Sequence, residues 1–161
     1  MTKEYSLDDL NPMTYDEYAT AVARLTGKLR TYCIMREVRF DIIVPILRSG
    51  AIPAGIIAHH LDIQHFLPVQ VYHEGRGLKQ VFTMPRMLDL SLTAPNILIC
   101  DNHTVSGAVA RRSIELVRES VPDSKICFSS VVTAYGGPAS FEHVEECFFG
   151  VQSNELCAAS P

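Results

Sequence analysis

The chain has 161 residues, of which 47% are hydrophobic and 20% are charged. This balance is typical of a globular domain and argues against a disordered chain. Lys and Arg number 14 and Asp and Glu number 18, which gives a net charge of −4. Bulk electrostatic binding to nucleic acid is therefore excluded, because it needs clustered cations.

Five cysteines are scattered along the chain and form no CxxC pair. A disulfide framework or a zinc site would need a tighter pattern, so we expect a reducing compartment. The first ten residues lack a signal pattern, and no run of eighteen apolar residues occurs. We therefore expect a cytoplasmic protein that does not enter a membrane.

Helical and strand patterns alternate from residue 14 onward. Thr14 and Glu17 have the spacing of a capping box at the start of an amphipathic helix predicted over residues 14–32. Strands are predicted over residues 40–47, 64–72, 96–101 and 125–134, and further helices over 51–61 and 107–120. This alternation predicts an α/β fold, a parallel sheet with helices on both faces.

Two further segments have weaker patterns. Residues 74–95 contain two glycines and two prolines, and an irregular stretch of this length predicts a flexible lid over a site. Residues 135–161 are predicted to be irregular. No repeat or linker divides the chain, so residues 1–161 are predicted to form one domain.

The loop of residues 101–108 lies between a predicted strand and a helix N-terminus. Free N–H groups at such a junction bind phosphate, with Ser106 and Thr104 as hydroxyl donors and Gly107 allowing close approach. Asp101, at the end of the strand, is able to accept hydrogen bonds from sugar hydroxyls. The alternative is a plain turn in which Ser106 caps the helix.

A second loop, Arg48-Ser49-Gly50, follows the predicted strand 40–47. Arg48 has the fork geometry that holds a pyrophosphate, and the alternative is a surface arginine on a tight turn. Ligands of parallel sheets bind beyond the carboxyl ends of the strands, where both loops are expected. The two loops together therefore predict one site for a phosphorylated small molecule.

The run Asp101-Asn-His-Thr-Val-Ser-Gly-Ala108 resembles the phosphoribosyl-diphosphate motif of the type I phosphoribosyltransferases. Residues 42–55, with 60–63, are similar to the pyrophosphate loop and following helix of that family. The likeness extends over about residues 13–155 and is closest to the xanthine and hypoxanthine-guanine branch. It implies the parallel-sheet fold of that family, with a small hood formed by the N-terminal segment and residues 135–161.

The resemblance also implies roles for individual residues. Asp101 and Asn102 would bind the ribose hydroxyls, Asp101 would contact Mg²⁺, and the lid of residues 74–95 would close over the site. The pyrophosphate and its Mg²⁺ would be held by Arg48, Ser49 and Gly50. The 5′-phosphate would lie in a cup of Thr104, Val105, Ser106, Gly107 and Ala108, and Tyr135 would lie beside the base. Phe149 is a candidate for stacking on the base in the hood, and packing in the core is the favoured alternative.

Four positions depart from the family pattern. Asn102 replaces the second acid, and Val105 stands where 6-oxopurine enzymes usually carry a proton-transferring Asp. Val109 replaces a hydroxyl residue, and Tyr135 replaces a lysine that contacts the base. His103 is a candidate for the missing proton transfer, since its ordinary pKa is near neutrality. The alternative for His103 is an exposed loop histidine.

The leading functional hypothesis is a Mg²⁺-dependent phosphoribosyltransferase of nucleotide salvage. It would join a nucleobase, a purine in preference, to phosphoribosyl diphosphate, and the family likeness implies a homodimer or tetramer. The competing hypothesis is a non-catalytic sensor that retains the pocket, which the changes at Asn102, Val105 and Val109 favour. An enzyme using a dinucleotide is disfavoured, because no GxGxxG follows a predicted strand.

Overall fold

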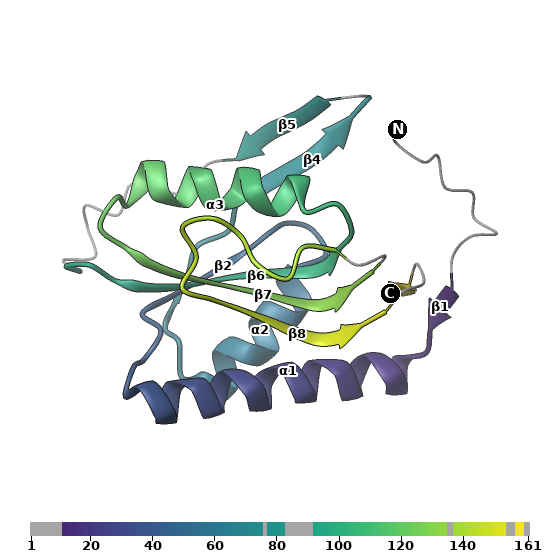
Figure 1. Cartoon of the computed structure of the whole chain (residues 1–161), viewed down its shortest axis with the longest axis horizontal. Helices are drawn as coiled ribbons and strands as arrows, with labels where there is room; N and C mark the ends of the chain where they lie inside the picture. Colours follow the sequence, from purple (N-terminus) through teal and green to yellow (C-terminus); the bar gives the residue numbers. More distant parts are fainter. Residues whose placement is uncertain (1–10, 76, 83–91, 135–136, 154–156, 160–161) are drawn as a thin grey trace.

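A central sheet of five parallel strands organises the computed structural model, which describes residues 11–75, 77–82, 92–134, 137–153 and 157–159. Its strand order is β3-β2-β6-β7-β8, and every neighbouring pair is parallel (Figure 1). The predicted parallel sheet is confirmed. The strands are β2 (Ile42–Pro45), β3 (His65–Phe66), β6 (Asn96–Thr104), β7 (Lys125–Thr133) and β8 (Glu146–Gln152).

Three helices cover the sheet, as the sequence predicted. Helices α1 (Tyr15–Arg36) and α2 (Ala51–Leu61) lie on one face, and α3 (Ala108–Ser120) lies on the other (Figure 1). In the described part of the chain, no helix is long and apolar enough to cross a membrane.

Helix α1 begins with the predicted capping box. The Glu17 N–H donates to Thr14 Oγ1 at 3.3 Å, and the Thr14 N–H donates to Glu17 Oε2 at 2.7 Å. The helix continues past the predicted end to Arg36, where Glu37 adopts a left-handed φ of 52°. Its N–H then donates to the Cys33 and Ile34 carbonyls, which closes the helix.

Successive residues of the central strands face two separate cores. Ile43 and Leu98 pack with the buried face of α1 and α2, whereas Ile42 and Ile97 pack under α3. All four are fully buried. Strands covered on both faces read as unbroken apolar runs, which is why the sequence located β2 and β6.

Two sequence predictions, one on a strand and one on the lid, are corrected. Residues 64–72 form two strands, β3 and β4 (Gln70–Glu74), with Pro68 between them. Part of the predicted lid is regular, since β5 (Gly77–Phe82) pairs antiparallel with β4. Residues 83–91 lie outside the described residues, and flexibility of the lid remains a prediction.

The segment 135–161, predicted to be irregular, contains the edge strand β8. Outside the central sheet, β1 (Asn11–Met13) pairs in parallel with β9 (Cys157–Ala159). These two short strands belong to the segments that were expected to form the hood. Their pairing brings the N-terminal and C-terminal parts of the chain together.

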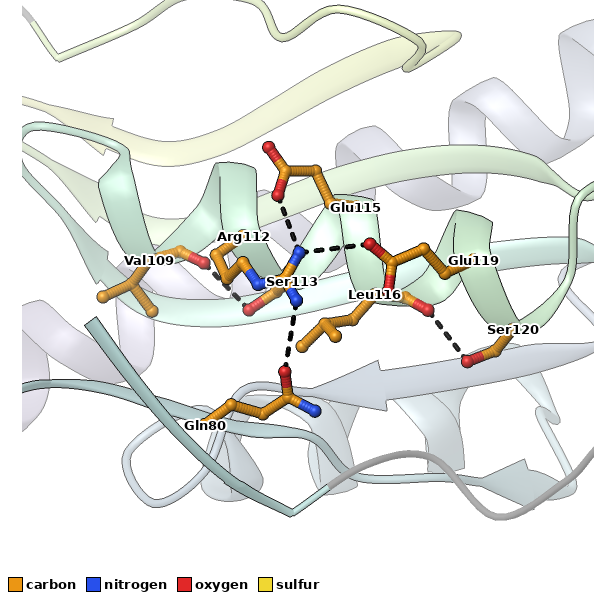
Figure 2. A network of polar contacts seen from close by, with 8 residues as sticks. All are labelled: Gln80, Val109, Arg112, Ser113, Glu115, Leu116, Glu119 and Ser120. Carbon is orange, nitrogen blue, oxygen red and sulfur yellow. Dashed lines mark hydrogen bonds and ion pairs between the residues drawn. The ribbon is translucent and has the colours of Figure 1, made fainter.

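Arg112 ties the β4–β5 hairpin to α3. Its Nη1 donates to Glu115 Oε2 at 2.9 Å and to Glu119 Oε1 at 3.2 Å, while its Nη2 donates to Gln80 Oε1 at 3.3 Å (Figure 2). Glu115 and Glu119 lie on α3, and Gln80 lies on β5. The guanidinium therefore bridges the helix and the hairpin.

Gly150 of β8 lies against the backbone of α1. A Cβ at this position would lie 2.5 Å from the Ala21 carbonyl oxygen and 2.7 Å from the Val131 carbonyl oxygen. We expect Gly150→Ala to lower the free energy of unfolding by about 1–3 kcal/mol, because backbone must move to admit the methyl group. Urea denaturation followed by circular dichroism measures the effect.

Gly55→Ala in α2 is the matched control, since a Cβ there meets nothing within 4 Å. This control is expected to raise the free energy of unfolding by up to about 1 kcal/mol, as alanine favours helix. Equal stabilities of the two variants would contradict the close packing of α1 on β8.

Candidate functional site

A cleft of about 980 Å³ opens at the carboxyl ends of β2 and β6. It joins the loop after β2 to the end of β6, and the β4 strand forms a further wall. The cleft therefore brings Arg48 and Ser49 together with Asp101 and His103, whereas residues 104–108, the predicted phosphate cup, are not among its lining residues. The lining residues are Ile46, Leu47, Arg48, Ser49, Ile52, Gln70, Val71, Tyr72, His73, Asp101, His103 and Val109.

The loop after β2 lies directly on the end of β6. The Ile46 N–H donates to the Cys100 carbonyl at 2.9 Å. A Cβ at Gly50 would lie 2.6 Å from both the Cys100 and the Ile46 carbonyl oxygens, so only glycine fits there. Gly50 is buried, whereas Arg48 and Ser49 are exposed at the cleft. The Leu47–Arg48 peptide bond is cis.

Asp101 forms the polar floor of the cleft and is only 7% exposed. Its Oδ1 accepts from the Asn102 N–H at 2.8 Å, and its Oδ2 accepts from the Thr104 hydroxyl at 3.3 Å. Burial raises the pKa of Asp101 to about 6, against the opposing effect of hydrogen bonds from Asn102, His103 and Thr104. Asp101 to Thr104 belong to β6 and not to the predicted loop of residues 101–108, so both carboxylate oxygens hold the end of this strand together.

Thr104 is also directed inward. It is buried, and its hydroxyl lies 3.1 Å from Ser130 Oγ as well as near Asp101. The predicted donation from the Thr104 hydroxyl to a phosphate is therefore not available in this conformation. Thr104 instead joins β6 to β7 below the loop.

Asn102 points toward α1. The Tyr18 hydroxyl donates to Asn102 Oδ1 at 2.7 Å, and burial raises the pKa of Tyr18 to about 12, which keeps the hydroxyl protonated. Among the described residues, the lining of the cleft includes Asp101 and His103 but not Asn102. Sequence reasoning missed Tyr18, since it fell on the apolar stripe of the helix.

His103 faces the cleft with one nitrogen unused. Its Nε2 is buried and has no hydrogen-bond partner among the described residues. Burial lowers the pKa of the imidazole, which favours the neutral form at pH 7. A neutral imidazole is able to accept a proton, but the buried Nε2 is not accessible to a group in the cleft in this conformation.

The predicted phosphate turn precedes α3. Gly107 has a φ of 74°, and a Cβ there would lie 2.6 Å from Pro138 Cγ, so the turn requires glycine. Ser106 is exposed, and its hydroxyl accepts from the Ala108 N–H at 3.3 Å. Val105 is half-buried. The N-cap of α3 is Gly107, and no side chain caps the helix, so the alternative interpretation of Ser106 as the cap is wrong.

Arg111 adds a cation that sequence reasoning had left on an outer helix face. Its Nη2 donates to the Ser106 carbonyl at 2.8 Å. The guanidinium therefore lies beside the predicted phosphate turn. Arginine one turn into a helix that follows a glycine-bearing loop was the signal available in the sequence.

The two predicted base contacts have different outcomes. Tyr135 lies outside the described residues. Phe149 is 5% exposed and packs in the core under α3, with its ring centroid 6.5 Å from that of Phe128. We therefore remove Phe149 from the base-binding set, since it lies on the α3 face of β8 and fills the core there.

Within the described residues, no group of three or more His, Cys, Asp and Glu side chains is arranged to hold a metal. Asp101 is the only carboxylate among the residues that line the cleft. A metal at this site would therefore take most of its ligands from a bound molecule or from water.

Comparison with solved structures identifies the fold. The purine phosphoribosyltransferase of Pyrococcus horikoshii has a TM-score of 0.72 and 18% identity, covering 93% of this chain and 92% of its own. The xanthine-guanine-hypoxanthine phosphoribosyltransferase of Helicobacter pylori has a TM-score of 0.66 and 16% identity, over 86% and 85%. The chain thus has the type I phosphoribosyltransferase fold, as the sequence predicted.

A hypothetical protein of Neisseria gonorrhoeae, solved with bound ppGpp, is similar as well. Its TM-score is 0.66 and its identity 18%, over 91% of this chain and 85% of its own. No family model matches the sequence, and no curated protein matches it. The likeness is therefore one of fold.

The buried carboxyl of Asp101 predicts a pH-dependent stability. The pKa of Asp101 is about 6 in the folded state, against an ordinary value of 3.8. The protonated carboxyl therefore contributes to the free energy of unfolding fully below about pH 4, and this contribution is lost as pH rises through 6. Between these limits wild type should lose about 3 kcal/mol of unfolding free energy relative to Asp101→Asn. Urea denaturation of both proteins across this pH range measures the difference.

Asp123→Asn, at an exposed residue in the turn after α3, is the control and should leave the profile of wild type unchanged. If the profiles of wild type and Asp101→Asn ran parallel across the same range, the burial of a titrating carboxyl at this position would be refuted.

Proposed function

We propose that the chain is a Mg²⁺-dependent phosphoribosyltransferase that joins a nucleobase to phosphoribosyl diphosphate and releases pyrophosphate. The observation that carries this proposal is the cleft shared by the Arg48–Ser49 loop and the end of β6. It lies where ligands of parallel sheets bind. We further propose a purine as the preferred base, and a cytoplasmic enzyme of nucleotide salvage that acts as a homodimer or tetramer.

Charge and free donors in the cleft support binding of a diphosphate. Arg48 and Ser49 are exposed there and offer a guanidinium fork and a hydroxyl. Beyond the lining of the cleft, the 5′-phosphate would lie at the turn of Ser106 and Gly107, near the N-terminus of α3 and the Arg111 guanidinium. The Val105 and Ala108 backbone would complete this cup.

Mg²⁺ fits a site with a single carboxylate, because this ion keeps several waters and binds substrate phosphates. Asp101 is the candidate protein ligand, although both its oxygens already accept hydrogen bonds from the loop. When bound, the ion would neutralise charge on the departing pyrophosphate. Arg48 would act on the same group from the opposite loop.

His103 is the proposed proton acceptor for the base. Its neutral form is favoured, so the imidazole is suited to take the N–H proton of an attacking nucleobase once a change of rotamer brings the buried, unpartnered Nε2 to the cleft. The Val105 side chain has no ionisable group for this purpose. The imidazole lies on the same strand end as Asp101, facing the same cleft.

Exclusion of water is the proposed task of the β4–β5 hairpin. A phosphoribosyl cation is captured by water, so the site must close during transfer. Tyr72 and His73 of β4 line the cleft, and the lid of residues 74–95 continues from them. Arg112 holds this hairpin to α3 through Gln80.

The second candidate is a non-catalytic protein that binds a phosphorylated nucleotide for regulation. It is favoured by the internal use of both Asp101 oxygens and by the contact of Asn102 with Tyr18, which leave no free carboxylate for a cationic transition state. The structural likeness to a protein solved with bound ppGpp is a further argument.

Turnover separates the two candidates. Incubation with phosphoribosyl diphosphate, Mg²⁺ and each common purine or pyrimidine should release pyrophosphate with at least one purine. Calorimetry with phosphoribosyl diphosphate and with ppGpp should be run in parallel. Tight binding without pyrophosphate release from any base would refute the transferase and favour the regulatory protein.

The proposed role of Arg48 gives a selective prediction. Arg48→Ala should weaken phosphoribosyl diphosphate binding by about 10- to 100-fold, because a hydrogen-bonded charge pair contributes about 1.5–3 kcal/mol. Binding of ribose 5-phosphate should change far less. Arg39→Ala, at an exposed ion pair with Asp62, is the control. Equal losses for both ligands in Arg48→Ala would contradict the assignment.

A further inference from the structure

A second cavity opens at the amino ends of the strands, at the opposite end of the sheet from the cleft. Figure 1 shows the C-terminal end of α1 on the same side of the molecule as the starts of β7 and β8. The cavity has a volume of about 240 Å³, below the roughly 300–1,000 Å³ of sites for drug-sized ligands, so its ligand would be small. We call it the amino-end pocket, and its lining includes Tyr32, Arg36, Phe40, Asn96, Lys125 and Glu145.

Backbone hydrogen bonds hold the rim of the amino-end pocket. The Asp41 N–H donates to the Asn96 carbonyl at 2.9 Å, and the Asn96 N–H donates to Asp41 Oδ2 at 2.8 Å. On the other side, the Glu145 N–H donates to the Ile126 carbonyl at 2.8 Å. The starts of the strands are thus tied to their neighbours, and the side chain of Asn96 forms no hydrogen bond of its own among the described residues.

Tyr32 forms a rigid wall with a free donor. Its ring stacks on that of Phe40, with centroids 6.3 Å apart, and meets Phe148 edge-on at 5.1 Å. The Cys127 thiol donates to the Tyr32 hydroxyl oxygen at 3.7 Å. Burial raises the pKa of Tyr32 to about 12, so the hydroxyl keeps its proton. Among the described residues this proton has no acceptor, and it is left for a ligand.

Charges of both signs border the pocket without pairing. The exposed side chains are Arg36, Lys125, Glu145 and Glu146, and within the described residues none of the four takes part in an ion pair. Burial is the main cause of the raised pKa of Tyr32, and among the smaller causes Arg36 lowers it while Glu145 raises it. A cation and an anion therefore both lie close to the Tyr32 hydroxyl.

This arrangement is complementary to a small molecule that carries both charges. A simple anion would be repelled by the carboxylates, and a simple cation would be repelled by Arg36 and Lys125. A carboxylate suits the guanidinium fork of Arg36, and an ammonium group suits Glu145. Beside them, Val38 and Phe40 give the pocket an apolar part.

We propose that the amino-end pocket binds a free α-amino acid with an apolar side chain. Arg36 and the Tyr32 hydroxyl donate to its carboxylate, and Glu145 accepts from its ammonium group. The apolar side chain of the ligand packs against Val38 and Phe40. The proposal depends on this pocket alone and not on the reaction proposed above, which uses the other end of the sheet.

Calorimetry with free amino acids tests the ligand class. At least one of L-valine, L-leucine and L-phenylalanine should bind to the full chain with a dissociation constant below about 1 mM. The two analogues of that ligand that lack the α-ammonium or the α-carboxylate should bind at least about tenfold more weakly, because each leaves charges of the pocket unpaired. In nuclear magnetic resonance spectra, the side-chain amide signals of Asn96 should shift on saturation with the amino acid.

Two charge-removing variants test the residues. Arg36→Gln and Glu145→Gln should each raise the dissociation constant at least about tenfold, since each removes a charged partner of the ligand. The matched controls are Arg24→Gln on the same helix and Glu142→Gln, both at exposed residues outside the lining of the pocket. The controls should bind as wild type does, and circular dichroism should show native helix content in all four variants.

Three outcomes would overturn the proposal. The first is the absence of binding for all three amino acids at about 10 mM. The second is an analogue with a single charge that binds as tightly as the amino acid, which would refute recognition of both charges. The third is wild-type affinity in both Arg36→Gln and Glu145→Gln, which would place the bound amino acid elsewhere on the protein.

Discussion

The close contact of two backbones at the end of the sheet determines the geometry of the site. The loop after β2 rests on β6, with the Cys100 carbonyl accepting from the Ile46 N–H at 2.9 Å and with no room for a side chain at Gly50. Because no side chain separates them, Arg48 and Asp101 open into one cleft. Backbone packing alone therefore brings together Arg48, whose charge suits a diphosphate, and Asp101, whose carboxyl suits a sugar.

Most polar groups at the end of β6 are already satisfied. Asp101 and Thr104 bond to each other and to their neighbours, and Asn102 accepts from Tyr18. A buried carboxylate without such partners would be far more costly. The loop is thereby held in one shape before any ligand arrives, and the groups left for a ligand are cations, hydroxyls and a neutral imidazole.

The sequence predicted what local patterns determine. Both central strands were recognisable since two-sided burial demands unbroken apolar runs, and the cap at Thr14 has a fixed spacing. It did not predict contacts between distant elements. Tyr18 looked like a core residue, and Phe149 was left between core packing, which was favoured, and base stacking, because the strand β8 that sets its orientation was missed. Edge strands carry a weaker pattern than central ones.

Helix α1 contacts both the core and the end of β6. Its inner side packs on β8 so closely that Gly150 has no room for a Cβ beside the Ala21 carbonyl, and its Tyr18 hydroxyl holds Asn102 at the end of β6. A shift of the helix along the sheet would therefore disturb the core and the Asn102 contact together. Because the backbone of Gly150 lies directly against the Ala21 carbonyl, the helix has little freedom to move along the sheet. The packing of α1 on the sheet thus fixes the orientation of Asn102. The end of β6 therefore has its conformation before a ligand binds in the cleft.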